Sequence, residues 1–156
     1  MWKVYHIDAC ILVSLLDGSD DYHKIYSQLF NRYNMHYLFR ITHVAFGETL
    51  HRLMVKKIDM DLGRISNRIQ HYNIEIRNMP DYNSLKKIMN FIREHDDRLD
   101  YNDILIVAAA IADKECSGLI TMDSNMIGNQ AIDLAAQNYG KKRFIVSDNP
   151  FKKHRR

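Results

Sequence analysis

Short apolar runs alternate along the chain with longer segments in which apolar residues recur every three or four positions. A short apolar run predicts a β-strand, and recurrence at i, i+3, i+4 and i+7 predicts an amphipathic helix. We therefore expect five strands, at residues 4–7, 37–41, 74–76, 118–121 and 144–146. Helices are expected at residues 9–16, 21–33, 81–94 and 131–139, and in three segments that begin near Thr42, near Asp59 or Asp61, and near Asp100 or Asp103.

The alternation of strands and helices predicts the α/β class. Strands joined through helices form parallel β-α-β units, so the expected architecture is a three-layer sheet with helices on both faces. At 156 residues, the chain is expected to be one domain, residues 1–150, followed by a basic tail at residues 151–156. In such a sheet the binding crevice lies beyond the carboxyl ends of the strands, so side chains that directly follow a strand are candidates for function.

Charge is distributed unevenly along the sequence. The last sixteen residues, 141–156, hold seven of the 22 Lys and Arg residues and one of the 19 acids, which gives +6 there and −3 in the rest of the chain. The basic end is a candidate contact for a nucleic-acid backbone. A solubilising terminus explains the same charges equally well.

Several functional classes lack their sequence signals. Cys10 and Cys116 form no C-x-x-C or zinc spacing, so a secreted disulfide framework is not expected. No apolar run has the roughly 18–20 residues of a membrane span, and the first residues lack a signal peptide, so we expect a cytoplasmic protein without membrane contact. The glycine motifs of dinucleotide and P-loop sites are also missing from the sequence.

Four acids occupy positions from which they can reach one crevice. Asp8 directly follows the first predicted strand, and Asp123 follows the fourth. Glu48 lies inside an amphipathic helix after Gly47, in what we expect to be a close-packed stretch, and Asp103 opens another helix. Four carboxylates without matching bases repel one another unless they hold a divalent cation. Oxygen ligands suit Mg²⁺ or Mn²⁺.

Each acid also has a structural explanation. Asp8 and Asp103 are good candidates for helix N-caps, and Asp123 is typical of a turn. Asp100 is either an auxiliary ligand or a surface or supporting charge, and Asn125 is a candidate neutral oxygen ligand. The four acids together are harder to explain as caps and turns than any one of them alone.

The sequence resembles the PIN-domain family of metal-dependent nucleases, and in particular its small stand-alone VapC-type toxin ribonucleases. The matching stretches each contain one of the four acids and are residues 5–12, 42–48, 103–110 and 119–123. The resemblance implies an α/β/α sandwich with a five-stranded parallel sheet in the order 3-2-1-4-5. It also implies Mg²⁺- or Mn²⁺-dependent hydrolysis of phosphodiester bonds, usually in RNA.

The resemblance further implies roles for the four acids. Asp8 and Asp123 would be metal ligands, Asp103 a third, and Glu48 a ligand directly or through water. The chain departs from the family pattern at Ala9, where many relatives carry Ser or Thr, so support for the metal ligands must come from elsewhere. Some relatives have a further acid after the fourth, where this chain has Ser124 and Asn125.

Partners are expected on the same grounds. Relatives commonly form homodimers, and toxin members are inhibited by an antitoxin protein. Five basic residues either line a groove for single-stranded RNA or simply lie on a solvated helix face: Arg52, Lys56, Lys57, Arg64 and Arg68. We also expect one helix to expose an apolar surface that suits a dimer or a partner peptide. This surface comprises Ile11, Leu12, Leu15 and Leu16.

The leading hypothesis is therefore a metal-dependent endoribonuclease, either alone or as the toxin of a toxin–antitoxin pair. The alternative is a PIN-like domain that binds RNA or protein without cutting. Saturable Mn²⁺ binding that depends on Asp8 and Asp123 would distinguish the two.

Overall fold

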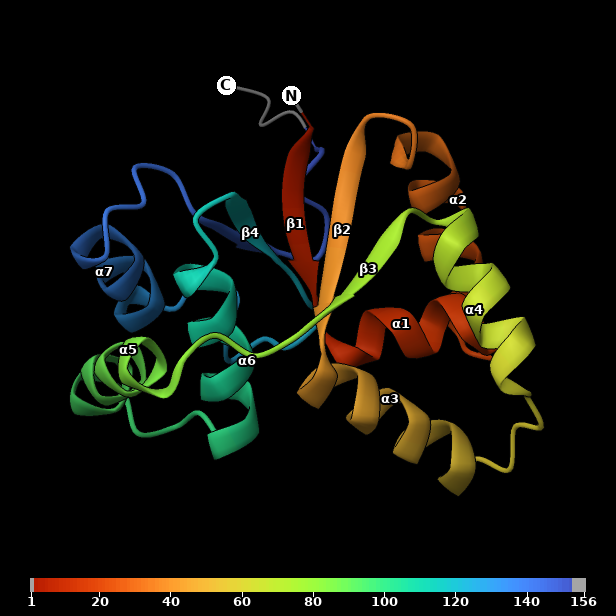
Figure 1. The fold of residues 1–156 in the computed structure, drawn as a ribbon, viewed down its shortest axis with the longest axis horizontal. Coiled ribbons are helices and arrows are strands. Elements are labelled where there is room, and N and C mark those ends of the chain that lie inside the picture. Colours follow the sequence, from red (N-terminus) through yellow and green to blue (C-terminus); the bar gives the residue numbers. More distant parts are fainter. Residues whose placement is uncertain (1, 153–156) are drawn as a thin grey trace.

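Five parallel strands form the central sheet of the computed structural model, which describes residues 2–152 (Figure 1). Their order is β3-β2-β1-β4-β5, as expected. Each observed strand overlaps a predicted one, and the strands are β1 (Lys3–Ile7), β2 (Tyr37–Thr42), β3 (Ile74–Arg77), β4 (Cys116–Ile120) and β5 (Ile145–Ser147). The chain thus has the predicted α/β fold.

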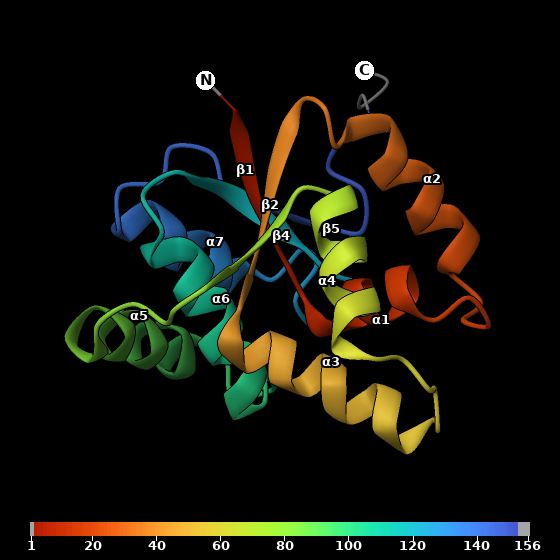
Figure 2. The same cartoon turned by 45° about the vertical axis from the view of Figure 1, so that its right-hand side comes forward.

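The helices make two layers around this sheet. They are α1 (Ala9–Leu16), α2 (His23–Tyr33), α3 (His43–Val55), α4 (Leu62–His71), α5 (Tyr82–His95), α6 (Tyr101–Ala112) and α7 (Gln130–Asn138). Helices α5, α6 and α7 cover one face, and α1, α2 and α4 cover the other (Figures 1 and 2). Helix α3 runs across the carboxyl end of the sheet, where α1 and α6 also begin.

The sheet face under α1 and α2 is apolar. Tyr5, Phe39 and Ile74 are aligned across β1, β2 and β3, and the Phe39 ring centroid lies 4.3 Å from that of Phe30 in α2. Burial of aromatic rings at this spacing is a main source of stability in a chain of this size.

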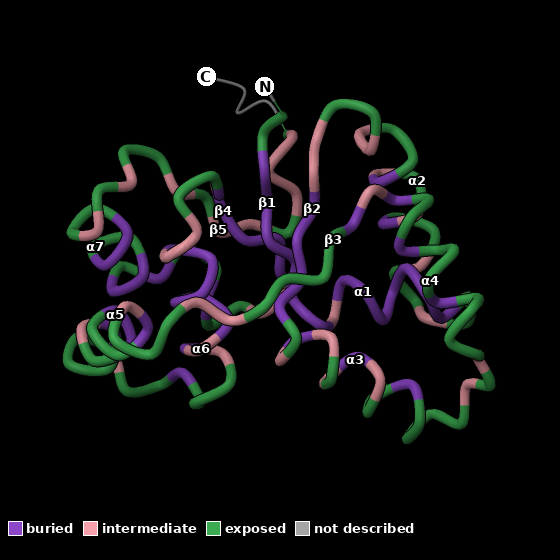
Figure 3. The backbone as a smooth tube through the Cα atoms, in the orientation of Figure 1, coloured by how far each residue is buried: buried purple, intermediate pink, exposed green. Residues whose placement is uncertain are grey.

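Helix α1 is buried almost throughout (Figure 3). The expectation of an exposed apolar surface on this helix is therefore wrong: the exposed fractions are 0% for Ile11, Leu12 and Leu15, and 4% for Leu16. The apolar residues face the protein core because α1 packs against both α2 and α3. This surface is not open to a second copy or a peptide.

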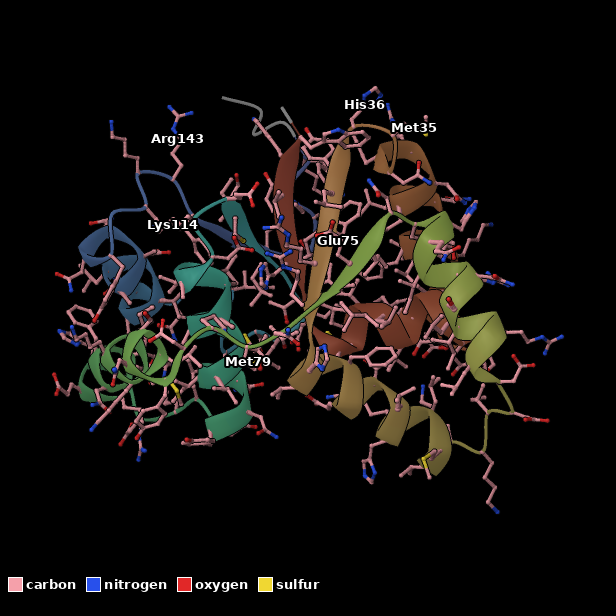
Figure 4. The ribbon with its side chains drawn as sticks, viewed as in Figure 1. Met35, His36, Glu75, Met79, Lys114 and Arg143 are labelled. Atoms are coloured by element: carbon pink, nitrogen blue, oxygen red, sulfur yellow. The ribbon has the colours of Figure 1, made fainter. Side chains whose placement is uncertain are left out.

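The opposite sheet face carries a charge network centred on the buried side chains of His6 and Arg40. His6, Arg40 and Glu75 are aligned across β1, β2 and β3, and Figure 4 labels Glu75 beside β3 on the side of β2. Arg40 donates to Glu75, to both carboxylate oxygens of Asp113 at 3.0 and 2.8 Å, and to Glu115. His6 is also buried, and its Nε2 lies 2.8 Å from Asp113 Oδ2.

Capping residues set most helix boundaries. Thr42 caps α3 as predicted, and Asp61, rather than Asp59, caps α4. Helix α6 is capped by Asp100, which accepts a hydrogen bond from the backbone N–H of Asp103 at 2.9 Å. The alternative in which Asp103 itself caps this helix is therefore wrong.

The C-terminal segment returns to the amino end of the sheet. The ring of Phe151 stacks on Tyr33 at 4.1 Å and also contacts Tyr37. Most of the predicted basic tail, residues 153–156, lies outside the described residues. Lys114 and Arg143 lie toward this same end of the sheet, away from the start of α3 (Figure 4). Between residues 2 and 152, no helix is long and apolar enough to cross a membrane.

Candidate metal centre

Asp8 lies buried at the junction of β1 and α1, with 6% of its surface exposed. Its Oδ1 accepts a hydrogen bond from the Ala9 N–H at 2.7 Å, and its Oδ2 accepts one from the Thr121 hydroxyl at 2.8 Å. Burial raises the pKa of Asp8, whereas these hydrogen bonds to the charged form oppose the rise. Asp8 is thus an N-cap of α1 and is also positioned at the carboxyl edge of the sheet, so its two interpretations are compatible.

Thr121 is a residue that the sequence interpretation did not include in the site. Its hydroxyl donates to Asp8 and accepts from the backbone N–H of Asp123 at 3.1 Å. It lies directly after β4, so a hydroxyl from that end of the sheet supports Asp8 where Ala9 has none to offer. In the sequence, the only sign that Thr121 belongs to the site is its place two residues before Asp123. The pairing of β1 with β4 is what brings it to Asp8.

Asp103 lies in the first turn of α6, close enough to the other acids for their charges to act on it. Burial and the neighbouring carboxylates of Asp100, Asp123 and Asp8 raise the pKa of Asp103 to about 7. Because Asp100 caps the helix, the carboxyl group of Asp103 is not needed for capping.

Asp123 starts a turn, as its structural interpretation predicted. Its Oδ1 accepts a hydrogen bond from the backbone N–H of Asn125 at 2.9 Å. The side chain is nevertheless half-buried, and its charge contributes to the raised pKa values of both Asp103 and Asp8. The side chain of Asn125 is exposed.

Glu48 does not lie in a close-packed stretch. Gly47 is exposed, and a methyl group added to it would meet no atom within 4 Å. The Glu48 side chain is 27% exposed, and its carboxylate accepts a hydrogen bond from Arg52 at 2.7 Å. The expectation of tight packing is wrong because this side of α3 lies along the rim of the molecule.

The acids meet the chemical requirements of a hard divalent cation, although their present positions do not form a complete cage. Carboxylate and hydroxyl oxygens gather where three chain segments meet, and burial together with the neighbouring carboxylates raises the pKa of Asp103 there. Within residues 2–152, no group of three His, Cys, Asp or Glu side chains is already arranged to hold one ion. Rotation of side chains such as Glu48 would be required.

A pocket of about 450 Å³ adjoins these acids. Its wall includes Cys10, two residues after Asp8, and Met122, which directly precedes Asp123. Of the five basic residues considered for an RNA groove, Arg52 and Lys56 line this pocket. We call this cavity the α1–α3 pocket, and its other lining residues are Val13, Asp20, Tyr22, His51 and Val55.

Comparison with known proteins gives one family and two informative structures. Residues 5–128 match the family model described as PIN domain. The fold resembles that of VapBC2 from Rickettsia felis, whose structure was solved bound to a DNA fragment from its promoter. The TM-score is 0.57 with 13% identity, over 92% of this chain and 98% of that one.

It also resembles VapC20 from Mycobacterium tuberculosis, described as a toxin that cleaves the sarcin–ricin loop. The TM-score is 0.54 with 11% identity, over 77% of this chain and 89% of that one. At these identities the likeness concerns the fold. Curated protein sequences give no significant match.

Proposed function

Because this chain belongs to the PIN-domain family, we propose that it is a divalent-metal-dependent endoribonuclease that hydrolyses RNA phosphodiester bonds. The observation that carries the proposal is the meeting of Asp8, Asp103 and Asp123 at the carboxyl edge of the sheet, where burial and the charges of the neighbouring carboxylates raise the pKa of Asp103 to about 7. Such a concentration of like charge is unfavourable without a cation, so its presence favours a metal site.

We assign the metal, Mg²⁺ or Mn²⁺, to Asp8, Asp103 and Asp123, with Glu48 as a further ligand directly or through water. When bound, such a metal supplies an activated water for in-line attack and offsets the charge that develops on the phosphoryl oxygens. Asp8 is held for this role by the Ala9 N–H and the Thr121 hydroxyl. Thr121 also holds the backbone of Asp123, so one hydroxyl sets the relative position of two ligands.

The biological setting is proposed from the same relatives. We propose a toxin-like ribonuclease with single-stranded RNA as substrate, an antitoxin protein as a partner and a homodimeric state. The support is the family together with the likeness to VapBC2 and VapC20. Because the apolar residues of α1 are buried, a homodimer would have to use another surface.

The decisive experiment is cleavage of a mixed panel of labelled RNAs with Mn²⁺, Mg²⁺ or EDTA. We expect metal-dependent cutting by the natural protein and none by Asp8→Asn. Asparagine keeps an oxygen that can accept from Ala9 and removes a buried charge, so the variant should fold. Circular dichroism and thermal melting check that expectation.

The matched control is Asp59→Asn, the same chemical change at an exposed loop residue that does not cap α4. It should cut like the natural protein. Equal cutting by Asp8→Asn would remove Asp8 from the site. RNA binding without cutting under every metal condition would instead favour the non-catalytic alternative.

A further inference from the structure

Arg52 makes an ion pair with an acid that the proposed metal centre also requires. Its Nη2 donates to Glu48 Oε1 at 2.7 Å across one turn of α3. This bond uses one of the five N–H donors of the guanidinium, and the Arg52 side chain is 46% exposed. Exposed pairs between positions i and i+4 are weak, so a stronger partner for either side chain can replace this bond.

The guanidinium lies next to both the acids and an open cavity. Arg52 lines the α1–α3 pocket together with Cys10, Tyr22 and Met122. Burial raises the pKa values of Asp8 and of the Cys10 thiol, and the positive charge of Arg52 opposes both shifts. The guanidinium therefore contacts an acid assigned to the metal centre and also lines an open cavity.

The shape and chemistry of the pocket suit one nucleotide. Its volume of about 450 Å³ is within the usual range for small-molecule sites, and its lining includes apolar side chains such as Val13 and Met122. Tyr22 is 51% exposed at its edge and offers a ring on which a base can stack. A base in the pocket would bring its own phosphate toward Arg52.

Lys56 also lines this pocket and was also considered for RNA binding. Its ion pairs hold it more firmly than Glu48 holds Arg52. Its Nζ lies 3.3 Å from carboxylate oxygens of both Asp17 and Asp20. Neither acid is assigned to the metal centre, so metal binding would leave Lys56 paired. Arg52 differs because its partner, Glu48, has a second role.

We propose that Arg52 binds an RNA phosphate at the mouth of the α1–α3 pocket, and that Glu48 holds its guanidinium until a metal ion takes up the Glu48 carboxylate. This inference rests on the proposed nuclease function. It makes the metal and the RNA bind cooperatively, since the metal frees the cation that the phosphate needs. Linkage requires the reverse effect as well, so RNA must also strengthen metal binding.

The test compares the natural protein with Arg52→Gln in two binding measurements. The first is calorimetric titration with Mn²⁺ in the absence of RNA. Removing Arg52 removes a competitor for Glu48 and a repelling charge, so the Mn²⁺ affinity should rise about threefold. If Arg52 instead merely oriented Glu48 for the metal, the affinity would fall.

The second measurement is fluorescence anisotropy of a labelled single-stranded oligouridine made resistant to cleavage by 2′-O-methyl groups, with gel analysis to verify that the RNA stays intact. With Mn²⁺ present, Arg52→Gln should bind this RNA about tenfold or more weakly, because a hydrogen bond between charged groups is lost. In EDTA its affinity should change little. Glu48→Gln should bind the RNA more tightly than the natural protein in EDTA, since Arg52 is then free without metal.

Arg32→Gln is the matched control, because Arg32 lies exposed in the last turn of α2, near the amino end of the sheet. It should leave the Mn²⁺ affinity unchanged, and its effect on RNA binding should be the same with and without Mn²⁺. If the natural protein binds Mn²⁺ and Arg52→Gln binds it equally well, the proposal that metal releases Arg52 from Glu48 is overturned, while the nuclease proposal stands. A natural protein that binds no Mn²⁺ overturns both.

Discussion

Single residues in this protein serve the fold and the candidate site at the same time. Asp8 caps α1 through one carboxylate oxygen and accepts from Thr121 through the other. The hydroxyl of Thr121 in turn holds the backbone of Asp123. Because the cap of α1 uses only one of the two carboxylate oxygens of Asp8, capping and metal binding do not exclude each other.

Replacing Thr121 by valine keeps the shape of the side chain and removes the hydroxyl. The Asp8 carboxylate then loses a donor, and the Asp123 N–H loses an acceptor. We expect a loss of about 1.5–3 kcal/mol in the free energy of unfolding, measured by urea denaturation in EDTA. The Mn²⁺ affinity should fall about 10–100-fold, as is common when a group that positions a metal ligand is removed.

Thr49→Val is the control for this prediction. Thr49 is also fully buried, but its hydroxyl donates to the Ala45 carbonyl within α3. Its loss should lower stability without a comparable change in Mn²⁺ affinity. Unchanged Mn²⁺ binding by Thr121→Val would show that Asp8 is positioned without the hydroxyl.

At the scale of one element, the start of α6 determines which acid is available for chemistry. Asp100 occupies the N-cap and satisfies the backbone N–H of Asp103. The Asp103 carboxyl therefore remains near Asp8 and Asp123, where burial and the other carboxylates raise its pKa to about 7. The prediction of two acids at this helix start was correct, and their separate roles depend on the helix geometry.

Asp100→Ala should destabilise the protein by about 0.5–2 kcal/mol through loss of the cap. It should also lower the pKa of Asp103 below about 7, because the largest contribution after burial, the charge of Asp100, is removed. Thermal melting and carboxyl NMR titration of the metal-free protein measure the two effects. Asp61→Ala removes the matching cap of α4 and should leave the pKa of Asp103 unchanged.

At the scale of the whole molecule, one buried arginine connects distant parts of the chain. Arg40 in β2 bonds to Glu75 in β3 and to Asp113 and Glu115 between α6 and β4. Burial alone would raise the pKa of Asp113, but hydrogen bonds from His6 and Arg40 outweigh burial and hold this pKa well below its usual value. The acids keep Arg40 charged inside the protein.

This network predicts a loss of stability in acid. The lowered pKa of Asp113 stabilises the folded protein above the ordinary pKa of 3.8, and this contribution is lost as the pH falls below that value. Asp113→Asn should lower the free energy of unfolding at pH 7 by about 3 kcal/mol, because Arg40 loses its bidentate partner. Denaturation at pH 7 and near pH 3 should show a smaller difference between the two pH values in Asp113→Asn than in the natural protein. An equal difference would remove Asp113 as its source.

The sequence alone was sufficient for the elements and the order in which the acids occur. Strand and helix periods follow from burial of one face or one stripe, which is a local property of the chain. The strand order 3-2-1-4-5 came from the family resemblance rather than from the pattern. Asp8, Glu48, Asp103 and Asp123 were candidates because each stands beside the end of a strand or inside an apolar helix.

Tertiary structure decided which of these side chains meet and what supports them. Thr121 reaches Asp8 only because β4 pairs with β1, and Glu48 is held at the rim by Arg52. The burial of α1 depends equally on packing against α2 and α3. Such contacts join residues that are far apart in the chain, so the local pattern of apolar and polar positions does not predict them.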